Sequence, residues 1–140
     1  MSSMQEVTVM VQKLMQEKGV TEESAKVAPG HWVFINGSFR FEIRLQTFKQ
    51  LGEIREGIAI AGYLMPLPAD PVKLAELQSE LLSINSQIVG AWFGIHQNQV
   101  LLVSSRELEN LDYSELLMMA DNISRLGDSF DDMIKEKYSN

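Results

Sequence analysis

Strict alternation of apolar and polar side chains over residues 39–46 constrains the fold more than any other feature of the sequence. Phenylalanine, isoleucine and leucine take the odd positions, and charged or amide side chains take the even ones. A period of two is typical of a strand with one face in the core and one in water, as in antiparallel sheets. Asn36-Gly37 stands just before it and favours a tight hairpin turn from a strand over residues 31–36.

Residues 58–68 predict a third strand, which ends at Pro66 because proline cannot donate to a sheet ladder. We expect residues 48–57 to form a turn region before this strand. Ala59 and Ala61 place small side chains on one face of the third strand. This predicts that a helix packs closely against that face.

Residues 90–105, GAWFGIHQNQVLLVSS, predict a second hairpin. Two apolar runs flank the polar letters HQNQ, in which we place the turn. Asn98 is the residue there that best tolerates a left-handed backbone angle. His96 is interpreted as a polar residue of this turn.

Three amphipathic helices accompany the strands. Residues 4–18 repeat apolar side chains at spacings of three and four, the period of a helix with one buried face. Asp70 followed by proline predicts the start of a second helix. Asp112 and Glu115 form a capping box before the third helix, which has the longest apolar stripe in the chain.

The predicted order is therefore helix, three strands, helix, two strands, helix, with residues 20–30 as a polar connector. No internal repeat or low-complexity segment interrupts it. Strands joined by hairpins, with helices between the groups, predict an α+β fold. We expect one domain over residues 1–140, with a twisted, mostly antiparallel five-stranded sheet and with the first and last helices on one side of it.

Composition excludes several classes of function. The 140 residues contain no cysteine, which removes disulfides, thiolate nucleophiles and cysteine-based zinc sites and fits a cytoplasmic location. The net charge of −7 argues against a nucleic-acid partner, because phosphate neutralisation dominates that affinity. No apolar run is long enough for a membrane helix, and no secretion leader is recognisable. We expect no cofactor, no metal and no membrane partner.

A surface for self-association is one interpretation of the remaining apolar residues. Leu117 and Met118 broaden the stripe of the last helix, and Trp92 alternates away from its neighbours in the second hairpin. Residues 26–55 carry five basic and two acidic side chains, whereas residues 112–140 carry three basic and seven acidic ones. A solvated surface explains these charges as well as complementary faces do. We predict a homodimer or another protein partner that uses Trp92, Leu117 and Met118.

Catalytic candidates are few. His31 and His96 are the only histidines, and neither has a second ligand at metal-binding spacing. The aspartates at 128, 131 and 132 share a helix face but lack the loop that calcium prefers, so we predict a solvated acidic face. The first hypothesis is a non-enzymatic interaction module. The alternative is a small ligand-binding protein or enzyme that uses a histidine in a pocket between sheet and helices.

The second half of the chain resembles the YbjN-type domain. The residues that carry the resemblance are Asn85, Phe93-Gly94, Val100-Leu101-Leu102, Leu108 with Leu111, and Asp131-Asp132. The resemblance extends over residues 80–134 in these motifs and over 4–138 in the order of elements. It implies the fold of type III secretion chaperones, which are small, acidic, homodimeric and not enzymes. It thus implies a chaperone-like or regulatory adaptor that binds polypeptide.

Overall fold

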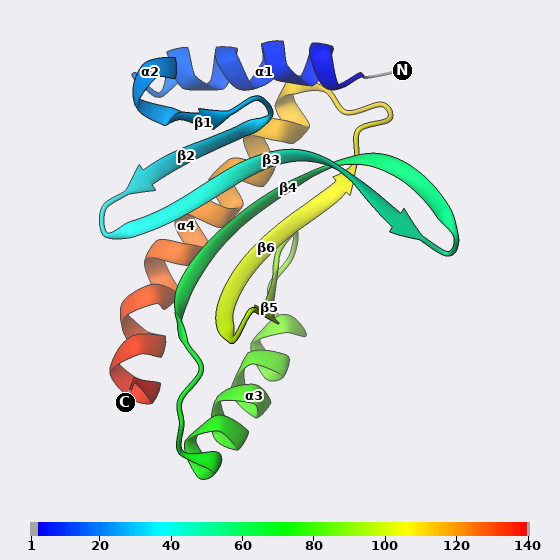
Figure 1. Ribbon diagram of the computed structural model, residues 1–140. Coiled ribbons are helices and arrows are strands. Elements are labelled where there is room, and N and C mark those ends of the chain that lie inside the picture. The colour runs from blue at the N-terminus through cyan, green and yellow to red at the C-terminus, as the bar shows by residue number, and fades with distance from the viewer. Residues whose placement is uncertain (1–2, 140) are drawn as a thin grey trace.

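Residues 3–139 are described by the computed structural model, in which six antiparallel strands form one twisted sheet (Figure 1). The elements are α1 (Met4–Glu17), α2 (Glu22–Ala25), β1 (Lys26–Ala28), β2 (His31–Asn36), β3 (Phe39–Gln50), β4 (Glu53–Pro66), α3 (Pro71–Asn85), β5 (Trp92–His96), β6 (Gln99–Glu107) and α4 (Tyr113–Tyr138). The strand order is β1-β2-β3-β4-β6-β5. The predicted α+β class is confirmed.

One core joins the helices to one face of the sheet. The buried side of α1 and the long stripe of α4 belong to the same apolar cluster as the odd-numbered residues of β3. We call this the covered face. The other face carries none of the helices of residues 3–139 and is turned toward the viewer in Figure 1. Half-buried packing of this kind is what the alternation over residues 39–46 predicted.

The predicted number of strands was wrong by one. β1 lies inside the segment interpreted as a connector and pairs only with His31 and Trp32 of β2, in an irregular register. All three of its residues are exposed. A strand so short and so exposed has no alternation from which it could be recognised.

The predicted turn region at residues 48–57 was also wrong. β3 and β4 continue through it and pair as far as Gln50 and Glu53. The turn consists of Leu51 and Gly52, both with positive φ, and leucine is an uncommon residue in that conformation. Figure 1 shows the ribbon of residues 46–56 projecting beyond the rest of the sheet.

Ala59 and Ala61 do not face a helix, in contrast to the prediction. They lie half-buried on the uncovered face of β4. The close approach of helix and strand occurs on the covered face, where the ring of Phe39 is inserted between Gly62 of β4 and Gly127 of α4. A Cβ atom at either glycine would lie 2.1 Å from that ring. Glycine, not alanine, provides the space.

The helix starts follow the predicted caps. The backbone N–H of Glu115 donates to Asp112 Oδ1 at 2.8 Å, and the N–H of Asp112 donates to Glu115 Oε1 at 3.2 Å, which completes the capping box. Asp70 accepts from the N–H of Val72 at 3.2 Å. These signals depend on neighbouring residues only, which is why they can be recognised in the sequence.

Both predicted hairpins are present, with shifted turns. In the second hairpin Gln97 and Asn98 have positive φ, as predicted for Asn98. His96, however, is the last residue of β5 and pairs with Gln99, so it lies outside the turn. In the first hairpin Asn36 belongs to β2, and the turn residues are 37 and 38.

Asp131 is not solvated, in contrast to the prediction for the acidic face of the last helix. Its side chain is 2% exposed. It forms an ion pair with Lys135 at 2.8 Å and accepts a long hydrogen bond of 3.4 Å from Ser38 Oγ. Asp131 is buried because α4 packs against the β2–β3 turn at this position. The hydrogen bond from Ser38 connects α4 to the sheet there.

Candidate functional site

The two histidines lie far apart in the sheet. His31 begins β2 and His96 ends β5, and three strands, β3, β4 and β6, separate β2 from β5. His31 Nε2 lies 3.4 Å from Glu42 Oε1, and Arg44 pairs with the same carboxylate at 3.1 Å. This charged group lies on the uncovered face. A pocket that joins both histidines is therefore ruled out by the strand order.

The three residues predicted for a partner surface have different environments. Trp92 is 41% exposed and Met118 is 64% exposed. Leu117 is half-buried against the core. A Cβ atom at Gly90 would lie 2.7 Å from Asn122 Nδ2, so the segment before β5 contacts α4 one turn beyond Met118. Trp92 alternates with the buried Phe93 and therefore lies on the uncovered face, whereas Met118 belongs to α4 on the covered face. The structure does not bring the three residues together, and Leu117 adds little exposed surface to that of Met118.

The outer edge of β2 is only partly covered. β1 pairs with the first two residues of β2, and no described strand pairs with the outer side of residues 33–36. Ile35 in this stretch is 74% exposed. Unpaired backbone groups on an edge strand are a template for pairing with another chain.

The register shows which backbone groups are free. A two-residue turn joins β2 to β3 between Asn36 and Phe39, and the residues that flank such a turn bond to each other. Alternate residues of an antiparallel strand direct their N–H and C=O groups away from the partner strand. Val33 and Ile35 therefore direct theirs to the outer edge. The pairing of Lys26 with Trp32 places the segment before β1 beside Val33, so among the described residues it is Ile35 whose outward groups face no strand.

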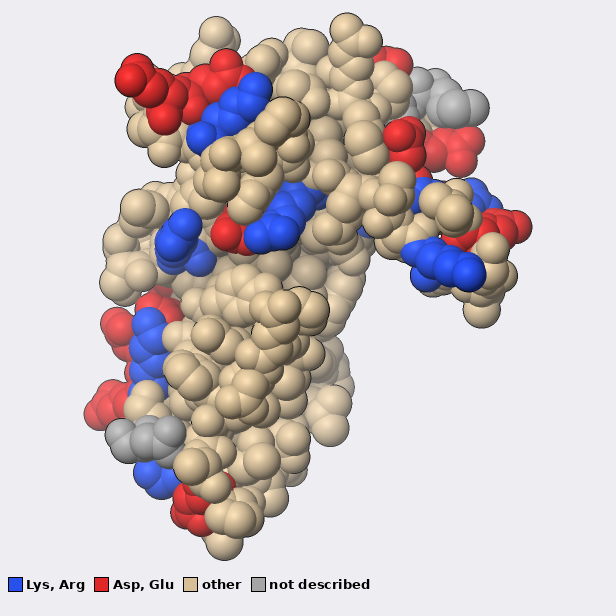
Figure 2. Space-filling view, in the orientation of Figure 1, with Lys and Arg blue, Asp and Glu red and all other residues tan. Residues whose placement is uncertain are grey.

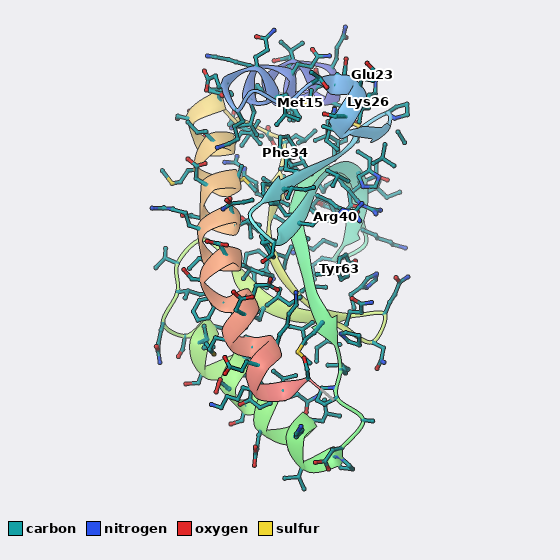
Figure 3. All side chains as sticks on the ribbon, turned by 90° about the vertical axis from the view of Figure 1, so that its left-hand side faces the viewer. Met15, Glu23, Lys26, Phe34, Arg40 and Tyr63 are labelled. Atoms are coloured by element: carbon teal, nitrogen blue, oxygen red, sulfur yellow. The ribbon has the colours of Figure 1, made fainter. Side chains whose placement is uncertain are left out.

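A hollow of about 600 Å³ lies along this edge. Phe34, Ile35 and Asn36 form one wall, and the end of α1 and the middle of α4 form the other. Figure 3 shows Phe34 below α1 on the side of α4, and Arg40 and Tyr63 away from α4. The stacked rings of Phe34 and Phe41, with centroids 5.5 Å apart, make the hollow apolar on the side of the sheet.

Polar links between α1 and α4 hold the far wall of the hollow in place. Lys18 Nζ lies 3.0 Å from Asp121 Oδ1. The hydroxyl of Tyr113 donates to Glu17, and burial together with this bond raises the pKa of Tyr113 to about 12. The tyrosine is therefore protonated at neutral pH and keeps its donor proton. These two links connect the end of α1 to α4 across the helical wall of the hollow.

The opposite edge is closed by a side chain. Asn85, the last residue of α3, accepts from the N–H of Phe93 at 2.6 Å and donates to the C=O of Phe93 at 3.0 Å. The amide thus makes the two hydrogen bonds that an added strand would make to Phe93, whereas the register directs the N–H and C=O of Ile95 outward beyond its reach. The sequence identified Asn85 only through a resemblance, and no sequence signal indicated the free edge of β2.

Two further findings limit the chemistry. Within residues 3–139 no group of three or more side chains is arranged to hold a metal ion. No helix in that part of the chain is both long and apolar enough to cross a membrane.

Comparison with known proteins identifies the fold. No family model and no curated protein sequence matches the chain. A chain of the ExsC–ExsE complex aligns over 96% of this chain and 97% of its own length, with a TM-score of 0.65 and 13% identity. A chain of the heterodimeric ExoU–SpcU complex from the type III secretion system of Pseudomonas aeruginosa aligns over 89% and 97%, with a TM-score of 0.60 and 11% identity.

YbjN of E. coli aligns over 90% of this chain and 92% of its own length, with a TM-score of 0.56 and 10% identity. At such identities the likeness concerns the fold. The predicted YbjN-type, secretion-chaperone-like fold is confirmed.

Proposed function

We propose that this protein is a non-enzymatic interaction module that binds an extended segment of another polypeptide along the free edge of β2. The observation that carries the proposal is the outward-facing backbone of Ile35 beside a hollow with an apolar wall at the sheet and a charged wall at the helices. An added strand would bond to this backbone and direct every second side chain into the hollow. Two structures of the same fold, ExsC–ExsE and ExoU–SpcU, are complexes of two proteins, which supports a protein ligand.

The proposal also includes a homodimer. Each copy carries a net charge of −7, so two copies repel each other on average and an uncharged surface favours their contact. Figure 2 shows such a surface over the lower parts of β4 and β6 and over α3. Its elements expose Tyr63 of β4 and Val72 and Leu82 of α3. An uncharged apolar patch can face itself across a twofold axis.

A proline placed in the edge tests polypeptide binding. In Ile35→Pro the outward N–H is lost, while no bond to β3 is lost because Ile35 and Arg40 form a non-bonded pair of the ladder. The matched control is Ile95→Pro on β5, which has the same position relative to its turn and is also exposed.

The probe is fluorescein-labelled ribonuclease A that has been reduced and carboxamidomethylated, so that it stays unfolded. We expect fluorescence anisotropy at physiological salt to show binding that Ile35→Pro weakens at least about tenfold and Ile95→Pro leaves unchanged. Equal effects of the two prolines, or no binding by the wild-type protein, would contradict the proposal.

Light scattering coupled to gel filtration tests the dimer. We expect a mass of about twice 15.8 kDa at micromolar concentration. Leu82→Glu and Tyr63→Glu should shift it toward the monomer, because a charge in the centre of an interface opposes association. Gln16→Glu, at an exposed polar position of α1, is the control. A monomeric wild-type protein would refute the dimer without affecting the edge proposal.

A further inference from the structure

The segment that covers the first part of the β2 edge is placed where a longer added strand would have to lie. α2 and β1 cross from α1 to β2, and β1 pairs with His31 and Trp32 only. The free stretch at residues 33–36 begins where this pairing ends. We call residues 20–29 the strap. In Figure 3 the labelled side chains of Glu23 and Lys26 lie on it, at the upper end of the sheet.

The strap is weakly attached to the rest of the molecule. Ala25 is its one buried side chain among residues 21–29. Its ion pair between Lys26 and Glu22, at 3.8 Å, lies within the strap itself. A hydrogen bond of 3.3 Å from Gln12 to Glu22 connects it to α1. Segments with few buried contacts open more readily than the core.

Glycines bracket the strap and allow it to move as a unit. Gly19 has a φ of +68° with nothing within 4 Å of a Cβ atom placed there, and Gly30 has a φ of +73°. Positive φ is the conformation that glycine adopts at least cost. Rotation about these two positions would detach β1 while α1 and β2 stay in place.

We propose that the strap is a displaceable guard of the polypeptide-binding edge, an inference that rests on the function proposed above. In the free protein β1 covers the start of β2 as a short edge strand, which limits unwanted pairing. A segment that pairs with more than the four residues 33–36 must displace β1. The apparent affinity for such a segment is then reduced by the fraction of molecules in which the strap is open.

Hydrogen exchange of the intact chain tests the mobility that this requires. We expect the amides of Lys26, Val27 and Ala28 to exchange at least about 100-fold faster than those of Ile43 and Ile60 in the inner strands. Equal protection of both groups would show that β1 opens only with the whole core. That result would overturn the inference.

Loosening the strap tests its role as a guard. Ala25→Asn introduces a polar side chain at the one buried position of the strap, and Ala91→Asn does the same at a buried alanine before β5. With the unfolded ribonuclease probe, we expect Ala25→Asn to bind about tenfold more tightly than wild type, and Ala91→Asn to show no gain. Exchange at Ile43 and Ile60 should stay unchanged in Ala25→Asn.

The two proposals fail in different ways. Binding by wild type with no gain in Ala25→Asn, despite faster exchange of β1, would refute the guard and leave the edge proposal in place. Absence of binding by every variant would refute both, because no ligand would then require displacement of the strap.

Discussion

β5 forms one edge of the sheet and β2 with its short partner β1 forms the other, and the chain treats these two edges differently. On β5 the amide of Asn85 bonds to both backbone groups of Phe93. On β2 the backbone of Ile35 faces outward without a strand beside it. One edge is bonded at Phe93 by a side chain of α3, whereas the other is covered over its first two residues by a short strand.

The contrast shows that edge protection can be selective. Two strands of similar length have an exposed isoleucine one residue before the end, Ile35 in β2 and Ile95 in β5. The β2 edge is lined by a hollow of about 600 Å³ that could receive side chains from a partner. Closing one edge directs strand addition to the other, which prevents open-ended association.

The largest expected effect comes from Asn85→Ala. It leaves the N–H and C=O of Phe93 unpaired in a partly buried site, and we expect a loss of about 2 kcal/mol in the free energy of unfolding. It also creates a second free edge, so light scattering should show a mass that increases with concentration. Urea denaturation measures the first effect.

Asn85→Asp is the matched variant, because it keeps the acceptor for Phe93 N–H and loses the donor. We expect an intermediate loss of stability. If neither substitution promotes association, the amide of Asn85 does not protect the edge.

Asp112→Ala separates general destabilisation from opening of an edge. Loss of the capping box should lower the melting temperature by about 3 °C. Asp112 precedes α4 and contacts neither edge, so we expect no concentration-dependent association. Association comparable to that of Asn85→Ala would mean that any loss of stability exposes the edges. An unchanged melting temperature would show that α4 does not depend on this cap.

The smallest expected effect concerns the attachment of α3, which carries Asn85. A hydrogen bond from Lys137 lowers the pKa of Glu80 below its ordinary value of 4.5. Burial of Glu80 raises this pKa, and a hydrogen bond from Tyr138 lowers it further, so the net shift is downward. A carboxylate whose pKa is lower in the folded than in the unfolded protein stabilises the fold at pH values above its unfolded pKa. This stabilisation is lost as the pH falls through the folded pKa. The contribution is below about 1 kcal/mol, because solvent screens exposed pairs.

We therefore expect Glu80→Gln to flatten the decrease in stability below pH 4.5, measured by urea denaturation at several pH values. Glu76→Gln, at an exposed position of the same helix, is the control. If the free energy of unfolding depends on pH in the same way for wild type and Glu80→Gln, the ion pair between Glu80 and Lys137 does not stabilise the packing of α3 against α4.

Prediction from the sequence succeeded where the signal is local. The alternation over residues 39–46, the Asp112 capping box and the turn at Asn98 each involve neighbouring residues, and each is present in the structure. Prediction failed where a feature contradicts local preference. Leu51 in a left-handed turn is such a case, and so is the buried carboxylate of Asp131. Packing against distant parts of the chain outweighs those preferences.

The sequence by itself determined the helices, most of the strands and the α+β class, because periodicity and caps are properties of short segments. Only the tertiary structure decided which strands are at the edges, since strand order depends on pairing between segments far apart in the chain. The same pairing decided that Asn85 meets Phe93 and that Ile35 meets no strand. Whether a backbone group is free or bonded depends on which segments lie beside it in space, and the amino-acid sequence of the strand itself does not specify those segments.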